Sequence, residues 1–97
     1  MELLIHALMS WTLRVTKSLH SQTYRKLTEL LVQARRKSGL TQQQVADALK
    51  THQSYVAKVE GGERRIDVVE FMEMTKALGL VPSTLLKKLE ATLPAKE

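Results

Sequence analysis

Two short amphipathic segments separated by a very short turn occupy the middle of the chain. Thr41 followed three residues later by Gln44 is a capping-box pattern, which predicts that a helix begins there. Only Lys50 and Thr51 separate this helix from a second one, which is expected over residues 52–60, with Thr51 as its N-cap. Helices this short bury little apolar surface alone, so the pair must pack on a platform made by the rest of the chain.

Three further helices are expected to supply that platform. Apolar residues recur at helical spacing over residues 23–37, over residues 67–78 and from Pro82 to the closing Pro94. Asp67, with the acid Glu70 three residues later, repeats the capping pattern and predicts the start of the second of these helices. With only 4 Gly and 2 Pro in 97 residues, the composition favours helices over turn-rich β structure. The sequence therefore predicts an all-α, compact five-helix domain. The expected inward face of the first helix is Leu27, Leu30, Leu31 and Ala34. One face of the second carries Val68, Phe71, Met72, Thr75 and Leu78, and the apolar side of the third carries Leu85, Leu86 and Leu89.

The positive charge of the chain is concentrated in its middle. Nine of the 15 basic side chains but only four of the 10 acidic ones lie in residues 24–65, which therefore hold the whole formal net charge of +5. A local basic stretch is typical of a protein that binds a polyanion. Charge alone fits a solvated surface that keeps the protein soluble equally well.

The outward face of the helix over residues 52–60 distinguishes these two interpretations. A helix-turn-helix unit places its second helix in the major groove of DNA. With Val56 and Val59 on the core side, the opposite side carries short polar residues and one cation, namely Gln53, Ser54, Ala57 and Lys58. Gln can bind adenine, Ser several base edges, and Lys guanine or a phosphate. An ordinary solvated face is commonly rich in Glu and Lys, so this composition favours base readout.

Several stretches carry a resemblance to a known family. They are residues 35–42 (RRKSGLTQ), Val45, Ala46 and Leu49, residues 53–65 (QSYVAKVEGGERR) and residues 77–80 (ALGL). Residues 27–89 as a whole resemble the lambda-repressor/Cro-like (XRE) helix-turn-helix family. The resemblance implies a lambda-repressor-like DNA-binding fold and a DNA-binding regulator, often a dimer on a palindromic site.

The resemblance also implies residue roles. Gln53, Ser54, Ala57 and Lys58 fall on the base-reading positions, and Arg35 and Glu60 form a structural ion pair in which Lys would replace Arg35 poorly. Dimerisation is expected, by analogy, through Leu85, Leu86 and Leu89. The residues expected at the DNA backbone are Thr41, Gln42, Gln43, His52, Tyr55, Arg64 and Arg65.

Two positions of the turn depart from the family pattern. Lys50 stands where the family usually has Gly, and Thr51 stands where an apolar residue is usual. Because a non-glycine residue with positive φ is strained, either Lys50 tolerates that strain or the turn has a slightly different shape.

The sequence lacks the residue patterns that are typical of catalysis, metal binding or cofactor binding. The absence of Cys excludes disulfides, thiolate catalysis and Cys-based zinc sites. The three histidines, at 6, 20 and 52, share no metal-ligand spacing, and neither a Gly-x-Ser-x-Gly motif nor a phosphate-binding glycine loop occurs. We therefore expect no enzyme, no metal and no cofactor.

The expected organisation is an N-terminal extension (1–22), the helix-turn-helix domain (23–91) and a C-terminal tail (92–97). In the extension, Leu4, Leu8, Trp11, Val15 and Leu19 recur at helical spacing, and the run is too short to span a membrane. It could be an amphipathic helix that docks on the domain, pairs with a second subunit or touches a membrane surface, or it could be a disordered extension.

The sequence thus predicts a cytoplasmic regulator, of bacterial or phage type, that binds double-stranded DNA sequence-specifically. We expect a repressor that acts as a homodimer on a palindromic operator, with the helix over residues 52–60 in the major groove. The alternative is a protein-binding module, such as the antitoxin of a toxin–antitoxin pair, in which DNA binding is secondary. Its partner would then be a toxin or another regulator.

Overall fold

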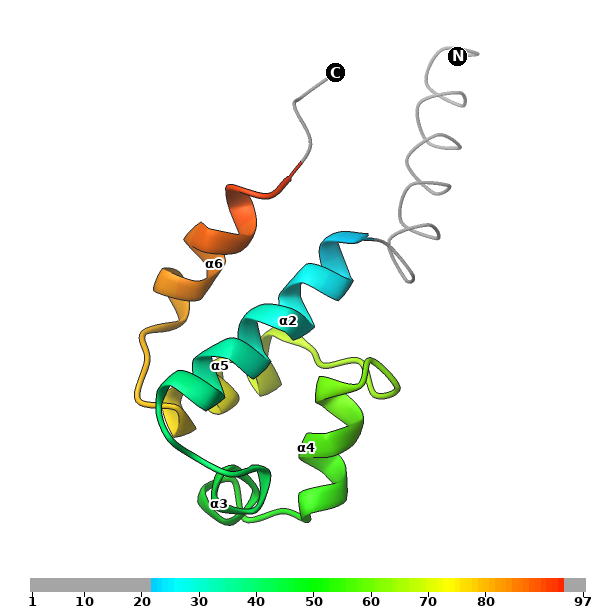
Figure 1. Cartoon of the computed structure of the whole chain (residues 1–97), viewed down its shortest axis with the longest axis vertical. Helices are drawn as coiled ribbons and strands as arrows, with labels where there is room; N and C mark the ends of the chain where they lie inside the picture. The colour runs from blue at the N-terminus through cyan, green and yellow to red at the C-terminus, as the bar shows by residue number, and fades with distance from the viewer. Residues whose placement is uncertain (1–21, 94–97) are drawn as a thin grey trace.

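The computed structural model describes residues 22–93, and this part of the chain consists of five helices and no strand (Figure 1). The helices are α2 (Gln22–Lys37), α3 (Gln42–Ala48), α4 (Gln53–Glu60), α5 (Val68–Ala77) and α6 (Pro82–Glu90). The predicted all-α, five-helix architecture is confirmed. The apolar stripe of the N-terminal extension and residues 94–97 of the tail lie outside the described residues.

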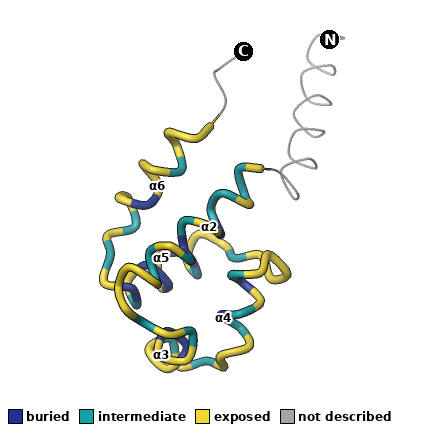
Figure 2. The backbone as a smooth tube through the Cα atoms, viewed as in Figure 1, coloured by how far each residue is buried: buried dark blue, intermediate teal, exposed yellow. Residues whose placement is uncertain are grey.

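One hydrophobic core holds the five helices together, and each helix contributes buried residues to it (Figure 2). The α3 and α4 pair rests on α2 and α5, and α6 packs against α2 and α5. Val56 and Val59 of α4 are fully buried, so α4 is anchored by its inward side. The buried apolar residues of the core are Leu31, Val45, Ala46, Val56, Val59, Phe71, Met74, Leu78 and Leu85.

Two helices begin at capping boxes that the sequence predicted. The Thr41 hydroxyl accepts from the Gln44 amide at 3.1 Å, and the Gln44 side chain accepts from the Thr41 amide at 2.8 Å. Asp67 and Glu70 form the same reciprocal pair at the start of α5, at 2.7 and 3.0 Å. These bonds satisfy amide donors that have no partner inside the helix, which fixes where each helix starts.

In the turn between α3 and α4, Lys50 tolerates the strained conformation, which was the first of the two expected alternatives. Lys50 adopts a left-handed conformation with φ of 56°. The Thr51 amide donates to the carbonyl of Ala46 at 2.9 Å, and the Lys50 amide donates to the carbonyl of Asp47 at 3.1 Å. These bonds close the end of α3 and keep Lys50 in a conformation that glycine adopts more easily.

Of the five residues predicted on one face of α5, Phe71, Thr75 and Leu78 are buried, but the other two are not. Val68 and Met72 are 73% and 51% exposed, whereas Met74, which was not expected inside, is buried. The face that packs is Phe71, Met74, Thr75 and Leu78, whose spacing of three, one and three residues follows one side of a helix. Val68 and Met72 were placed on the packing face because they are apolar, although single apolar side chains are common on protein surfaces.

Two helix ends also differ from the prediction. The N-cap of α4 is His52 rather than Thr51, and its side chain makes no capping hydrogen bond. Helix α6 ends at Glu90, before the predicted end at Pro94, and Ala91 is its C-cap. Pro82 occupies the first turn of α6, as expected for a residue without an amide donor.

Candidate nucleic-acid interface

The outward face of α4 is small and polar. Gln53, Ser54 and Lys58 are exposed, and Ala57 between them is half-buried. Val56 and Val59 lie on the opposite side of the helix and are fully buried. The structure therefore brings the four predicted base-reading residues onto one side of a single anchored helix.

Gln53 is held in place by a neighbouring glutamine. Its Nε2 donates to Oε1 of Gln42 at 2.7 Å, and Nε2 of Gln42 donates to Oε1 of Glu60 at 2.9 Å. Gln42 is the first residue of α3, whereas Gln53 and Glu60 are the two ends of α4. A chain of hydrogen bonds thus runs across the helix-turn-helix unit and ends at the exposed face.

Arg35 anchors the other end of this chain. Its Nε and Nη2 donate to the two oxygens of Glu60 at 2.6 and 3.0 Å, and its Nη1 donates to the carbonyl of Leu40 at 2.9 Å. The two charged side chains are only 13% and 9% exposed. The hydrogen bond to Glu60 raises the pKa of Arg35 above its ordinary value. The fork of the guanidinium thus joins α2, the α2–α3 turn and α4.

This chain fixes the orientation of the Gln53 amide. The Glu60 carboxylate beside Arg35 only accepts hydrogen bonds, so Gln42 must turn its NH₂ group toward Glu60. Its carbonyl oxygen then faces Gln53, which must in turn direct its own NH₂ group at Gln42. One hydrogen of that NH₂ group and the carbonyl oxygen of Gln53 remain for a ligand.

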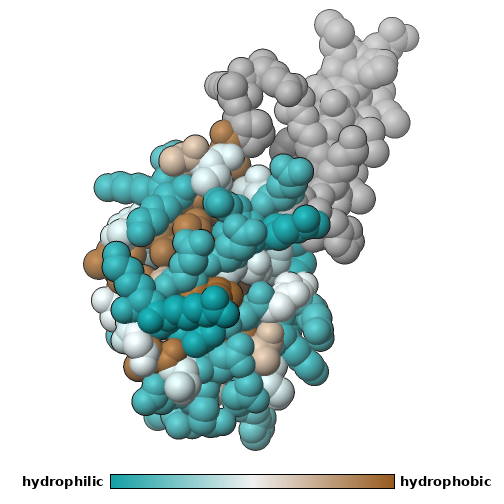
Figure 3. Space-filling model, in the orientation of Figure 1, coloured by the Kyte–Doolittle hydropathy of each residue, from teal (hydrophilic) through white to brown (hydrophobic). Residues whose placement is uncertain are grey.

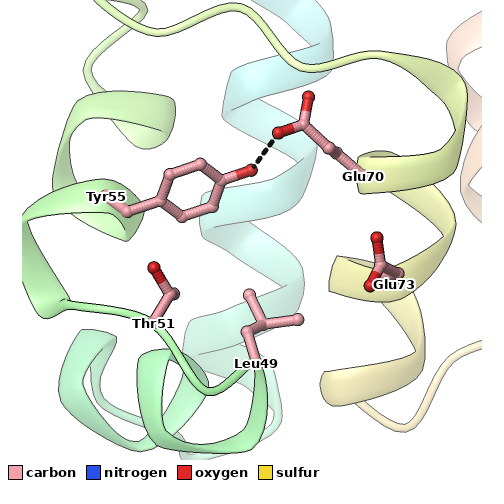
Figure 4. A pocket seen from close by; sticks show the side chains of 5 residues that line it. All are labelled: Leu49, Thr51, Tyr55, Glu70 and Glu73. Atoms are coloured by element: carbon pink, nitrogen blue, oxygen red, sulfur yellow. Dashed lines mark hydrogen bonds between the residues drawn. The ribbon is translucent and has the colours of Figure 1, made fainter.

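A second cluster holds the other flank of α4. Oε2 of Glu70 accepts from the Tyr55 hydroxyl at 2.9 Å and from Nη2 of Arg64 at 2.8 Å. The Arg64 guanidinium also lies over the Tyr55 ring, 5.5 Å from its centre. Burial and the hydrogen bond to Glu70 raise the pKa of Tyr55 to about 12. In Figure 4, Tyr55 reaches across a pocket lined also by Leu49, Thr51 and Glu73 toward Glu70 on α5.

Sequence reasoning missed Glu70 as a member of the site. The capping-box pattern identified one of its oxygens, which accepts from the Asp67 amide. The role of the other oxygen depends on α4 and α5 lying side by side, which no local pattern contains. Arg64, predicted at the DNA backbone, is therefore paired in the free chain, with its side chain 50% exposed.

Arg65 and Tyr24 tie the loop after α4 to the beginning of α2. The Arg65 guanidinium lies 4.2 Å from the centre of the Tyr24 ring. The Tyr24 hydroxyl accepts from the amide of Ile66 at 3.3 Å. The loop that carries both Arg64 and Arg65 is thus attached at two points, to α5 through Glu70 and to α2 through Tyr24.

The other predicted backbone-contact residues lie around the start of α3 and the turn. Thr41 and Gln43 are exposed, and Gln43 donates to Asp47 on its own helix at 2.8 Å. His52 is exposed at the N-cap of α4. Within residues 22–93, no cluster of three or more His, Cys, Asp or Glu side chains could hold a metal ion.

One of the three leucines expected at a dimer surface belongs to the core instead. Leu85 is 2% exposed, because it faces α2 and α5 from the inner side of α6. Leu86 is 47% exposed and Leu89 is half-buried, so only these two remain available to a second copy. Among the described helices, none is long and apolar enough to cross a membrane.

Comparisons with known proteins agree with this geometry. The helix-turn-helix family model matches residues 31–86. An XRE-family like protein from Pseudomonas syringae pv. tomato str. DC3000 shares 45% identity, with a TM-score of 0.76 over 82% of this chain and 98% of that one. The restriction-modification controller protein C.AhdI from Aeromonas hydrophila shares 29% identity, with a TM-score of 0.60 over 67% of this chain and 99% of that one. No curated protein sequence matches. The chain belongs to the XRE family of helix-turn-helix DNA-binding transcriptional regulators.

Proposed function

We propose that the chain is a repressor that binds a palindromic operator as a homodimer, with α4 in the major groove. The observation that carries this proposal is the exposed, polar face of α4 together with the hydrogen-bond chain that orients Gln53. A side chain whose donor and acceptor are already oriented loses little conformational freedom when it meets a base.

Gln53 is the residue we assign to adenine. One hydrogen of its NH₂ group is used by Gln42, so the second hydrogen and the carbonyl oxygen can pair with N7 and N6 of adenine. Ser54 and Lys58 are exposed beside it, and Lys58 can donate to guanine. Ala57 leaves space for the base edges and offers a methyl group to thymine.

The residues around this face would hold the DNA backbone. Exposed donors flank α4 at the start of α3, at the turn and in the loop after the helix. Arg64 and Arg65 supply positive charge, which is attracted to phosphates and gives affinity without sequence preference. The full proposed set is Thr41, Gln42, Gln43, His52, Tyr55, Arg64 and Arg65.

We propose that Leu86 and Leu89 on α6 form the centre of the dimer contact. A two-fold axis there would present two copies of α4, and reading a palindrome requires them to lie about 34 Å apart. Such a dimer represses transcription by occupying the promoter, and it acts in the cytoplasm. The name of C.AhdI identifies a relative that acts as a controller of a restriction-modification system, which supports a regulatory role.

Selection of bound duplexes from a random pool, followed by fluorescence anisotropy, tests the proposal. We expect a palindromic site whose tight binding is lost in Gln53→Ala combined with Lys58→Glu. Lys76→Glu is the matched control, because it changes the charge equally at an exposed position of α5, away from the proposed dimer contact. If no sequence is enriched, or if the double variant binds the selected site as well as the control does, the proposed reading face is wrong.

A further inference from the structure

A largely apolar groove runs between α2 and α6, away from the residues assigned to DNA. Its cavity volume is about 470 Å³. Leu85 and its neighbour Leu78 form the floor, and Leu30, Ala34 and Leu80 form the walls. Lys37 and Lys88 stand at the rim. In Figure 3, hydrophobic surface lies among hydrophilic side chains on the side of the molecule where α6 is found.

The chain itself contains a segment with matching properties. Twenty-one residues precede α2, and their sequence places Leu4, Leu8, Trp11, Val15 and Leu19 at spacings of four, three, four and four. This spacing puts the five side chains on one side of a helix. Arg14 and Lys17 fall off the stripe, so the apolar side would enter the groove without bringing these cations toward Lys37 and Lys88.

The segment is long enough to run back along α2 as an antiparallel helix. The turn would lie near His20 and Ser21, since polar residues suit a short connection between antiparallel helices. Leu30 lies about 12 Å from the start of α2 at 1.5 Å per residue, and Trp11 lies about 15 Å back from Ser21. An antiparallel pairing therefore places Trp11 beside Leu30 and Leu8 beside Ala34.

We propose that residues 1–21 fold back along α2 and place Leu8 and Trp11 in the α2–α6 groove. The covalent connection favours this occupant, because a short tether gives an effective concentration in the millimolar range. Within the proposed dimer contact, Leu86 faces away from the groove. Leu86 and Lys88 are two residues apart on α6, so their side chains point about 160° apart.

Trp11 reports directly on this proposal, because it is the only tryptophan in the 97 residues. In the whole chain, we expect its fluorescence emission to be blue-shifted and protected from quenching by acrylamide. Ala34→Glu places a charge on the groove wall, so the emission should shift to the red and the protection should be lost. Ala48→Glu is the matched control, because Ala48 is an exposed residue at the end of α3, and this variant should behave like the unmodified chain.

A second variant keeps the test independent of folding defects in α2. Leu8→Asp alters only the segment, so it should expose Trp11 while the helical circular dichroism of the domain persists. A tryptophan that is solvent-exposed in the unmodified chain would overturn the proposal. So would protection that survives Ala34→Glu, which would mean that the segment packs elsewhere. Protection that disappears on dilution would assign the groove to the segment of a second copy, and the intramolecular proposal would then be wrong.

Discussion

Oε1 of Glu60 accepts hydrogen bonds from both Arg35 and Gln42, at 3.0 and 2.9 Å. One carboxylate thus connects α2, α3 and α4, and its charge determines which way the Gln42 amide points. The ion pair that holds α4 therefore also sets the direction of the amide hydrogen bonds that end at Gln53. The Arg35–Glu60 ion pair and the proposed reading face are therefore parts of one hydrogen-bond network.

The first prediction concerns sequence discrimination. Gln42→Leu removes the connection between Glu60 and Gln53 but leaves the Arg35 pair in place. We expect the preference for the base read by Gln53 to fall by about tenfold, because a good bidentate contact is worth about 1–3 kcal/mol of discrimination. Anisotropy titrations on the selected site and on a variant of that base pair measure the ratio. Gln43→Leu is the neighbouring control and should weaken both duplexes alike. An unchanged ratio in Gln42→Leu would contradict the proposed orienting role.

The second prediction concerns the pairing of Arg64 with Glu70. In the free chain Glu70 competes with any phosphate for the guanidinium, which is bonded to it at 2.8 Å. We expect Glu70→Gln to strengthen binding to all duplexes. Arg64→Ala should weaken it and lower the salt dependence by about one phosphate contact. In a double-mutant cycle, the gain from Glu70→Gln should largely disappear once Arg64 is replaced.

The double-mutant cycle also cancels the general gain in DNA affinity that comes from removing a negative charge. The loss of a negative side chain attracts DNA whether or not Arg64 is present, so only the difference between the two backgrounds reports on the pair. Equal gains in both backgrounds would show that Arg64 does not move from Glu70 to a phosphate.

Features that depend on neighbouring residues in the sequence were predictable. The capping boxes at Thr41 and Asp67 are complete within four residues, so the pattern alone locates the start of α3 and of α5. The buried face of α4 also followed from the two valines at helical spacing. The Arg35 and Glu60 contact spans 25 residues and was expected only through the family resemblance.

Features that depend on packing between distant segments were not predictable. Glu70 reaches Tyr55 because α5 lies beside α4, and Tyr24 meets Arg65 because the loop returns to α2. The misassignment of Val68 has the same cause, because periodicity shows that a helix has an apolar side but not where its neighbours lie. Leu85 and Leu86 are adjacent apolar residues, and only the position of α2 and α5 decides which one is buried.

The third prediction concerns the strained turn. Lys50 has φ of 56°, a conformation in which a β-carbon approaches the following carbonyl oxygen. Lys50→Gly should increase the free energy of unfolding by about 0.5–1 kcal/mol, after allowance for the greater freedom of glycine in the unfolded chain. Urea unfolding measures the change. Lys50→Ala retains the β-carbon and should give no such gain. Equal stabilities of the Gly and Ala variants would show that the strain is not significant.

The fourth prediction concerns pH. Because the pKa of Tyr55 is raised to about 12, the folded chain holds the phenol proton more tightly than the unfolded chain, in which the pKa is about 10. The stabilisation is therefore fully present below pH 10 and is lost as the pH rises from about 10 to about 12. Tyr55→Phe cannot ionise, so the stability difference between the two chains should shrink over this range in urea unfolding. All other residues are the same in the two chains, so their contributions cancel in this difference. A difference that stays constant up to pH 12 would contradict the assignment.

The fifth prediction separates the dimer surface from the core. Leu86 is 47% exposed, so Leu86→Asp should leave the monomer folded but weaken self-association by more than about fivefold, which corresponds to 1 kcal/mol at an interface. Leu85 is 2% exposed, so Leu85→Ala should instead lower the free energy of unfolding by about 2–5 kcal/mol. Sedimentation equilibrium measures the first effect and urea unfolding the second. Met72→Asp is the control, because Met72 is 51% exposed on α5 and should leave the dimer intact. Dissociation by Met72→Asp, with Leu86→Asp still dimeric, would move the dimer contact from α6 to α5.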